Sequence, residues 1–144
     1  MMKARAGSRA VGTLMTIAAL LTGCGGSEVT QTPPLTPENG PWSAHVLGLG
    51  LVLDLAWTPD SVHGTGTYTF LTGQFGCGAP AGTGNVTFAA SRSATNDVQG
   101  FMSFDNGWTP PFHGSLVSDT HVAGGFMSID AGPCPLDLFR GLVP

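Results

Sequence analysis

The chain has 144 residues, enough for one domain, and its 22 glycines and 11 prolines favour a turn-rich β fold over helices. Lys3, Arg5 and Arg9 lie at the amino terminus, and the remainder sets Arg92 and Arg140 against nine carboxylates, a formal charge of −7 without a lysine. So acidic a chain excludes nucleic acid as a partner, and it offers anionic lipid no basic face.

The first 24 residues have the organisation of an export signal. Their basic start precedes an apolar run over residues 10–21, which is long enough for a signal peptide and too short to span a bilayer. The next residues, Leu21-Thr22-Gly23-Cys24, resemble the bacterial lipobox, in which an aliphatic residue and two small residues precede a cysteine. The resemblance implies that residues 1–23 are a lipoprotein signal peptide and that Cys24 is lipidated after cleavage. The alternative is an ordinary signal peptide that leaves Cys24 as a free thiol.

A lipidated Cys24 predicts an anchored protein, because several acyl chains together hold a bilayer almost permanently. The expected location is the cell envelope. Resemblance to proteobacterial sorting makes the outer membrane the default, since Gly25 carries no acidic retention signal. Residues 24–41 are polar and rich in proline and glycine, so we expect a flexible tether that reaches roughly 20–25 Å.

From Trp42 onward, short segments of alternating apolar and polar residues are separated by turn-forming residues, a pattern typical of hairpins. The pattern predicts eight strands, over residues 42–47, 51–57, 62–70, 84–91, 98–105, 112–118, 121–129 and 136–140. Short connections favour antiparallel pairing of sequential strands. We therefore expect an all-β domain over residues 42–144, an antiparallel eight-stranded up-and-down meander that closes into a small barrel. The alternative is a two-sheet β-sandwich.

The alternation also assigns one face of each strand to the interior. Seven aromatic residues fall on that face: Trp57, Tyr68, Phe70, Phe88, Phe104, Phe112 and Phe126. They are sufficient to fill a small barrel, which favours a filled core over a ligand cavity. Five glycines share the inward face: Gly64, Gly66, Gly100, Gly114 and Gly124. Such a band indicates tight coiling, room for rings across the core, or a cavity.

The two ends of the predicted domain carry a second family pattern. Gly40-Pro41-Trp42 opens the first strand, and Arg140 lies in the last. This resembles the calycin signature of lipocalins and avidins, in which a first-strand tryptophan is covered by an arginine from the last strand. The resemblance implies that Trp42 plugs one end of the barrel and that Arg140 lies over it in a cation–π contact. The alternative for Trp42 is an ordinary core aromatic.

Cys77 and Cys134 remain as a pair if Cys24 is lipidated. In a meander, the connections after the third and seventh strands emerge at the same end, so the two cysteines are expected to form a disulfide in an oxidising compartment. The other possibility, a metal site, lacks the paired cysteine or nearby histidine spacing that such sites use.

No motif in the chain indicates catalysis or a cofactor. His45, His63, His113 and His121 are scattered over four predicted strands, and neither a nucleophile elbow nor a phosphate-binding loop is found. We therefore expect no enzymatic activity, no cofactor and no metal site.

The expected function is that of a lipid-anchored interaction or structural module whose protein partner is unknown. The alternative is a calycin-like binder of a small apolar ligand. Contact with either is expected at the barrel mouth far from the tether, near Trp108, Phe75 and Phe112, because aromatic anchors on braced loops are common in recognition sites. The competing interpretation of Trp108 is that its loop packs back on its own barrel.

Overall fold

The computed structural model describes residues 34–46, 48–71, 77–128 and 132–141, which belong to one compact unit, Pro33–Pro144. The expected signal peptide, Cys24 and Phe75 lie outside the described residues. Within the described ranges the regular structure is β-strand: β1 Gly40–Val46, β2 Leu49–Trp57, β3 Ser61–Phe70, β4 Gly82–Arg92, β5 Asp97–Phe104, β6 Pro111–Ser118, β7 His121–Ser128, β8 Gly132–Pro135 and β9 Leu138–Arg140.

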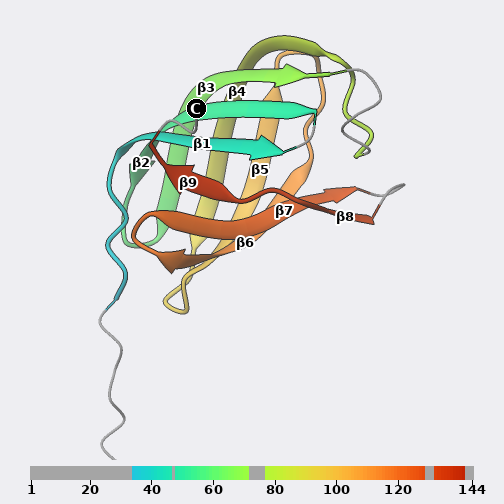
Figure 1. The fold of residues 1–144 in the computed structure, drawn as a ribbon. Coiled ribbons are helices and arrows are strands. Elements are labelled where there is room, and N and C mark those ends of the chain that lie inside the picture. Colours follow the sequence, from blue (N-terminus) through green and yellow to red (C-terminus); the bar gives the residue numbers. More distant parts are fainter. Residues whose placement is uncertain (1–33, 47, 72–76, 129–131, 142–144) are drawn as a thin grey trace, which may run out of the picture. The chain divides into compact units, whose positions relative to one another are not determined.

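The sheet closes on itself. Its strand order is β6-β5-β4-β3-β2-β1-β9-β7-β8, every pair is antiparallel, and an additional β6–β7 pairing completes the ring. Figure 1 shows the last strand, β9, beside the first, β1. The predicted antiparallel eight-stranded up-and-down barrel is therefore confirmed, and the two-sheet sandwich is excluded.

The eighth strand differs from the prediction, which placed it over residues 136–140. β8 pairs with one end of β7 and β9 with the other, so the two short strands together take the eighth place. Between them, the Asp137 carboxylate accepts a hydrogen bond from the Gly124 backbone N–H at 3.2 Å. The Asp137 side chain replaces a backbone carbonyl as the hydrogen-bond acceptor, so the ladder of backbone hydrogen bonds along β7 is interrupted at this point. Cys134 consequently lies on β8 and not in a connection.

Aromatic rings meet across the interior. Phe88 on β4 and Phe112 on β6 have ring centroids 5.3 Å apart, and those of Phe104 on β5 and Phe126 on β7 are 6.1 Å apart. Neither pair comes from adjacent strands, so the rings bridge the barrel. The buried rings support a core that is filled by side chains.

The inward glycines lie where neighbouring strands approach closely. A Cβ atom on Gly66 would overlap the carbonyl oxygen of Val52, and one on Gly100 would overlap that of Ala89. Gly114 and Gly124 face each other in register on β6 and β7. These contacts support the interpretation of the glycine band as a device for tight coiling.

The residues just before β1 lie against the barrel, although the sequence predicts a flexible tether up to residue 41. We call residues 34–39 the strap. Pro37 is buried, Leu35 packs against the core, and the Asn39 side chain accepts a hydrogen bond from the Trp57 backbone N–H at 2.7 Å. The ordered domain therefore includes the strap, because its apolar residues are buried and its polar groups are paired.

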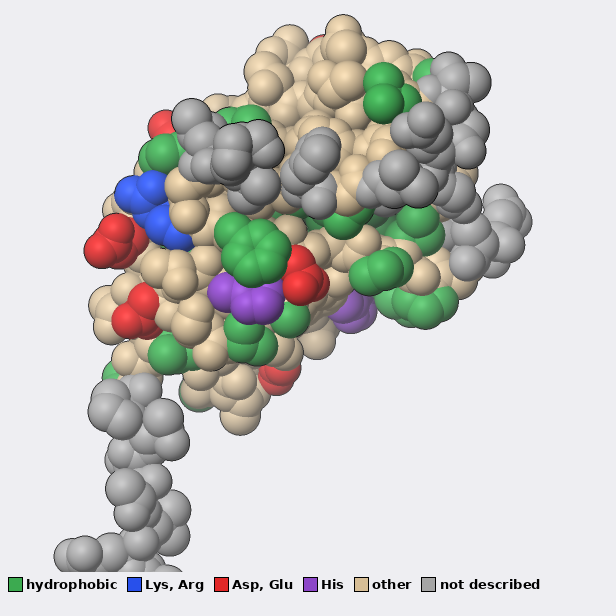
Figure 2. Space-filling model, viewed as in Figure 1, with side chains coloured by type: hydrophobic (Ala, Val, Ile, Leu, Met, Phe, Trp, Pro, Cys, Tyr) green, Lys and Arg blue, Asp and Glu red, His purple; other side chains and the backbone are tan. Residues whose placement is uncertain are grey.

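Charged side chains are sparse on the surface, and Figure 2 shows much of one face as backbone and small polar side chains. Among the described residues, no helix is long and apolar enough to cross a membrane. The same residues contain no group of three or more His, Cys, Asp or Glu side chains that could hold a metal ion.

Candidate functional site

The aromatic residues predicted at the far mouth face inward. Phe112 has an exposed fraction of 0% and belongs to the core. Trp108 is half-buried, and its ring centroid lies 5.1–5.4 Å from those of Phe70, Phe104 and Phe126. The Trp108 loop thus packs back on its own barrel, so neither residue is presented as a binding anchor.

The same mouth is braced by a disulfide. Cys77 and Cys134 are bonded, with their Cα atoms 5.9 Å apart, as predicted from the parity of the connections. A crosslink between residues 57 apart in sequence stabilises the folded state by about 4 kcal/mol in the chain-entropy model.

Trp42 and Arg140 are brought together, but their contact differs from the expected one. Trp42 is fully buried and pairs in register with Arg140 across the β1–β9 junction. The calycin resemblance implies that the guanidinium covers the indole ring. In the structure it donates hydrogen bonds to the carbonyl oxygens of Pro41 and Asn39, both at 2.9 Å, and its Nε lies 3.8 Å from Glu38. Arg140 clamps the entering backbone, while the Trp42 ring packs against Trp57, with centroids 5.5 Å apart.

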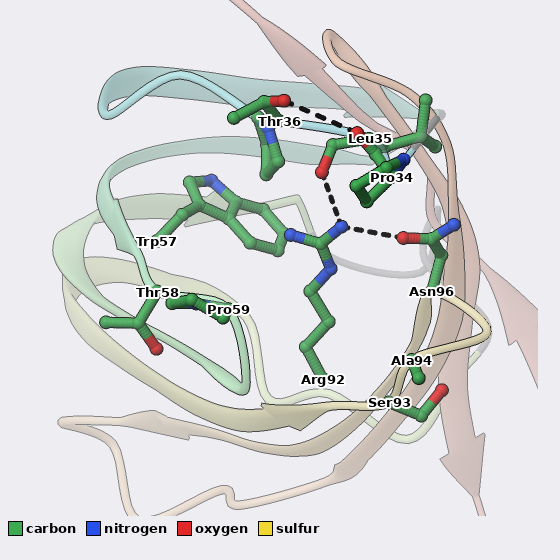
Figure 3. Close-up of a pocket in the computed structure, with 11 residues that line it drawn as sticks. Pro34, Leu35, Thr36, Trp57, Thr58, Pro59, Arg92, Ser93, Ala94 and Asn96 are labelled. Carbon is green, nitrogen blue, oxygen red and sulfur yellow. Dashed lines mark hydrogen bonds between the residues drawn. The ribbon is translucent and has the colours of Figure 1, made fainter. Parts of the chain in front are cut away.

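A pocket lies where the strap meets the barrel, at the end opposite the Trp108 loop and the disulfide. It has a volume of about 420 Å³ and is lined by strap residues 34–37, by residues 57–59 after β2, and by residues 92–94 and Asn96 at the β4–β5 turn. We call it the strap pocket. Six of its lining residues are apolar: Pro34, Leu35, Pro37, Trp57, Pro59 and Ala94. Figure 3 shows Arg92 extending between these walls.

Arg92 is the charged group of the strap pocket. Its Nη2 donates to the Leu35 carbonyl oxygen and to the Asn96 side-chain oxygen, both at 2.6 Å. No carboxylate among the described residues lies within ion-pair distance of it, and its buried Nε has no hydrogen-bond partner there. The guanidinium is half-buried in an acidic domain, so its positive charge lacks a counter-charge.

Two acidic residues near Arg92 have carboxylates that are engaged elsewhere: Asp60, whose carbonyl oxygen accepts a hydrogen bond from the Arg92 backbone N–H at 2.7 Å, and Asp97, five residues further along the chain. Asp60 accepts a hydrogen bond from the Thr58 hydroxyl at 2.9 Å. Asp97 accepts from the Thr95 hydroxyl at 2.6 Å and the Ser115 hydroxyl at 3.1 Å, and these bonds lower the pKa of its carboxyl. The carboxylate of Asp97 therefore shapes the β4–β5 turn and leaves Arg92 unneutralised.

The turn itself places Asn96 beside Arg92. Asn96 has a φ of 67°, a left-handed conformation that asparagine tolerates better than most residues, and its N–H donates to the Ser93 carbonyl oxygen at 3.0 Å. This tight turn directs the side-chain oxygen of Asn96 to the guanidinium (Figure 3).

Trp57 forms the facing wall. It is the last residue of β2 and is half-buried, although the alternation pattern predicts an inward core residue. Its indole N–H is buried and has no acceptor among the described residues. Two donors of residues that line the strap pocket, this N–H and the Nε of Arg92, are thus buried and unpaired among the described residues.

The sequence predicts neither Arg92 nor Trp57 as a site residue. Two signals were available: Arg92 is one of two cations after residue 24, and Leu35 is an apolar residue in a stretch that otherwise reads as polar. Neither signal shows that the strap folds back, because that depends on contacts between residues distant in sequence.

An apolar row crosses the outside of the barrel. Phe101 on β5 is the register partner of Pro111 on β6, and Met127 on β7 is that of Pro133 on β8; Phe101 and Met127 are 56% and 44% exposed. His113 lines a shallow pocket together with Met127 and Pro133, and His63 and His121 also lie on the outer surface. His121 pairs with Asp137 at 3.1 Å and stacks on Phe139.

The fold and these two surfaces define a small closed β-barrel with an end pocket. No protein-family model, curated protein or solved structure matches the chain.

Proposed function

We propose that this chain is a lipid-anchored lipoprotein of the cell envelope, by default of the outer membrane, whose barrel is a non-enzymatic binding module. Its binding site is the strap pocket. The observation that carries the proposal is Arg92, a half-buried guanidinium without a carboxylate partner among the described residues. A desolvated and unpaired charge costs free energy, so its retention at a pocket is typical of a ligand site.

The filled interior supports a site outside the barrel. A calycin-like cup would need space among the inward rings, and Phe88, Phe112 and Phe126 are fully buried against one another. The strap pocket, by contrast, has a volume within the range of about 300–1,000 Å³ that small-molecule sites occupy.

A fragment screen by NMR tests the proposal with the purified exported protein in a non-ionic detergent. The chain has three tryptophans, so three indole N–H signals can be assigned by single Trp→Phe variants. We expect fragments to shift the Trp57 signal and to leave that of Trp108 in place. Fragments that shift Trp108 alone, or a screen in which none shifts Trp57, would contradict the proposal.

The apolar row on the outer surface favours a second candidate, a protein-interaction module. Apolar residues in two register pairs on four neighbouring strands present hydrocarbon at the surface, as interfaces do. A photocrosslinker at position 127 should then capture a defined envelope protein, and one at the outward Thr67 should not. Equal capture from both positions would exclude this candidate.

A further inference from the structure

Resting on the proposed function, we propose that the strap pocket binds a small monocarboxylate with an apolar body. The carboxylate would lie at Arg92, and the body would pack on Trp57 and the prolines of the pocket wall. The residues of the pocket indicate three properties of the ligand: its charge, its acceptor atoms and its apolar part.

The charge follows from Arg92. The pocket contains one guanidinium and, among the described residues, no carboxylate close enough to neutralise it. A ligand with one negative charge would complete the pair. A polyanion would leave charge uncompensated, and the acidic remainder of the domain would repel it.

The acceptor atoms follow from the free part of the guanidinium. Nη2 of Arg92 donates to Leu35 and Asn96, and Nη1 makes no hydrogen bond to the described residues. A carboxylate has two acceptor oxygens and binds guanidinium groups with good geometry.

The apolar body follows from the walls. Pro34, Leu35, Pro37, Trp57 and Pro59 line the same pocket as the guanidinium, and these side chains present hydrocarbon and ring surface. A bare inorganic anion would leave that surface in water. An aryl or acyl carboxylate would cover it while its head group reaches Arg92.

The strap contributes to recognition as well as to the wall. The Leu35 carbonyl and the Asn96 side chain both hold Nη2 of Arg92, so they fix the guanidinium from two sides. The Nη1 group, which makes no hydrogen bond to the described residues, is left for the ligand. Such fixing reduces the rotamer entropy that Arg92 would lose on binding.

Benzoate and benzamide are the probes for the experiment, because they share a flat apolar body and differ in charge. The purified exported protein is titrated with each while the indole N–H signal of Trp57 is followed by NMR. We expect benzoate to shift this signal and to bind at least tenfold more tightly than benzamide, since a charged hydrogen-bond pair is replaced by a neutral one. Equal affinity for the two probes would overturn the carboxylate inference while leaving the pocket as a binding site.

Two variants locate the charge. Arg92→Gln should weaken benzoate binding at least tenfold, whereas His113→Gln, a substitution on the outer face of the barrel that does not line the strap pocket, should change it less than twofold. An unchanged affinity in Arg92→Gln, or no shift of Trp57 by benzoate at saturating concentration, would overturn the inference. The comparison of the two probes uses the wild-type protein alone, so it stands even where a variant fails to fold.

Discussion

Gly66 on β3 faces Leu53 on β2 at a point where the two strands have no room for a side chain. An added Cβ would overlap the Val52 carbonyl oxygen and approach the Leu53 Cα to 2.8 Å. Both are backbone atoms, which cannot yield as a flexible side chain would. Glycine at this position is therefore required by the close approach of the strands.

Gly66→Ala should lower the free energy of unfolding by about 3 kcal/mol, because the strands must separate to admit the methyl group. Gly50→Ala is the matched control on β2, where an added Cβ meets nothing within 4 Å. It should stay within about 1 kcal/mol of the wild type. Denaturant unfolding measures both, and a Gly66→Ala variant as stable as Gly50→Ala would show that the strands are not packed this closely.

Asp105 holds β3, β4 and β5 together after the end of β5. Its carboxylate accepts hydrogen bonds from the Asn85 backbone N–H at 2.7 Å and the Tyr68 hydroxyl at 2.9 Å, and these bonds lower its pKa from the ordinary 3.8. Burial, with hydrogen bonding to Asp105 next, raises the pKa of Tyr68. Folding thus favours the ionised carboxylate and the neutral phenol.

The lowered pKa gives the Asp105 contribution a defined pH window. The stabilisation is complete above the unfolded pKa near 3.8 and is lost as the pH falls through the lower folded pKa. Asp105→Asn should therefore be less stable than the wild type at pH 6, and the difference should shrink below pH 4. Unfolding curves across that range check it; a difference independent of pH would contradict the role of the ionised group.

The loop between β5 and β6 gains its order from Trp108. The Trp108 indole stacks on Phe104 at a centroid distance of 5.1 Å. The Trp108 backbone N–H donates a hydrogen bond to the side-chain oxygen of Asn106 at 3.0 Å. The loop is thus an extension of the core and not a free recognition element.

Trp108→Ala should destabilise the protein by about 3 kcal/mol, because the truncation leaves Phe70, Phe104 and Phe126 without their packing partner. Benzoate binding at the strap pocket should persist at low denaturant concentration. A Trp108→Ala variant of wild-type stability would restore this residue as a candidate binding anchor.

At the scale of elements, strand positions follow from local patterns and the strap does not. Alternation of side chains identifies β2 to β7, since each turns one apolar face inward. The break between β8 and β9 depends on Asp137 reaching the Gly124 N–H, a contact that no local pattern reports. The strap pocket was missed for the same reason, because Leu35 and Arg92 meet across 57 residues.

At the scale of the whole molecule, the anchor determines where the strap pocket lies. The strap joins the barrel at the end that holds the β2–β3, β4–β5 and β6–β7 turns, as its contacts with Trp57, Arg92 and Asp119 show. Pro34 follows Cys24 by ten positions in the sequence, and a chain of that length spans at most about 35 Å. If Cys24 carries lipid, the pocket works close to the bilayer surface.

The proposed anchor makes a direct prediction. Metabolic labelling with an alkyne fatty acid should mark the wild-type protein and should not mark Cys24→Ser, because the thioether-linked lipid requires the thiol. Cys77→Ser is the control and should be labelled like the wild type, since that cysteine is held in the disulfide. Equal labelling of Cys24→Ser would exclude this residue as the site of lipidation.

The junction of β1 with β9 has a consequence for how the chain reaches its native state. No turn spans it, and it is held by two register pairs and by the bond from Arg140 to the Pro41 carbonyl, 99 residues away. A contact between residues so far apart in sequence has the largest entropic cost of loop closure, so it should form late and slow the folding reaction. The Gly141 N–H also bonds to the Pro41 carbonyl at 2.8 Å, so the start of β1 adjoins the residue that follows β9. A circular permutant that links them would turn this slowest contact into a local hairpin.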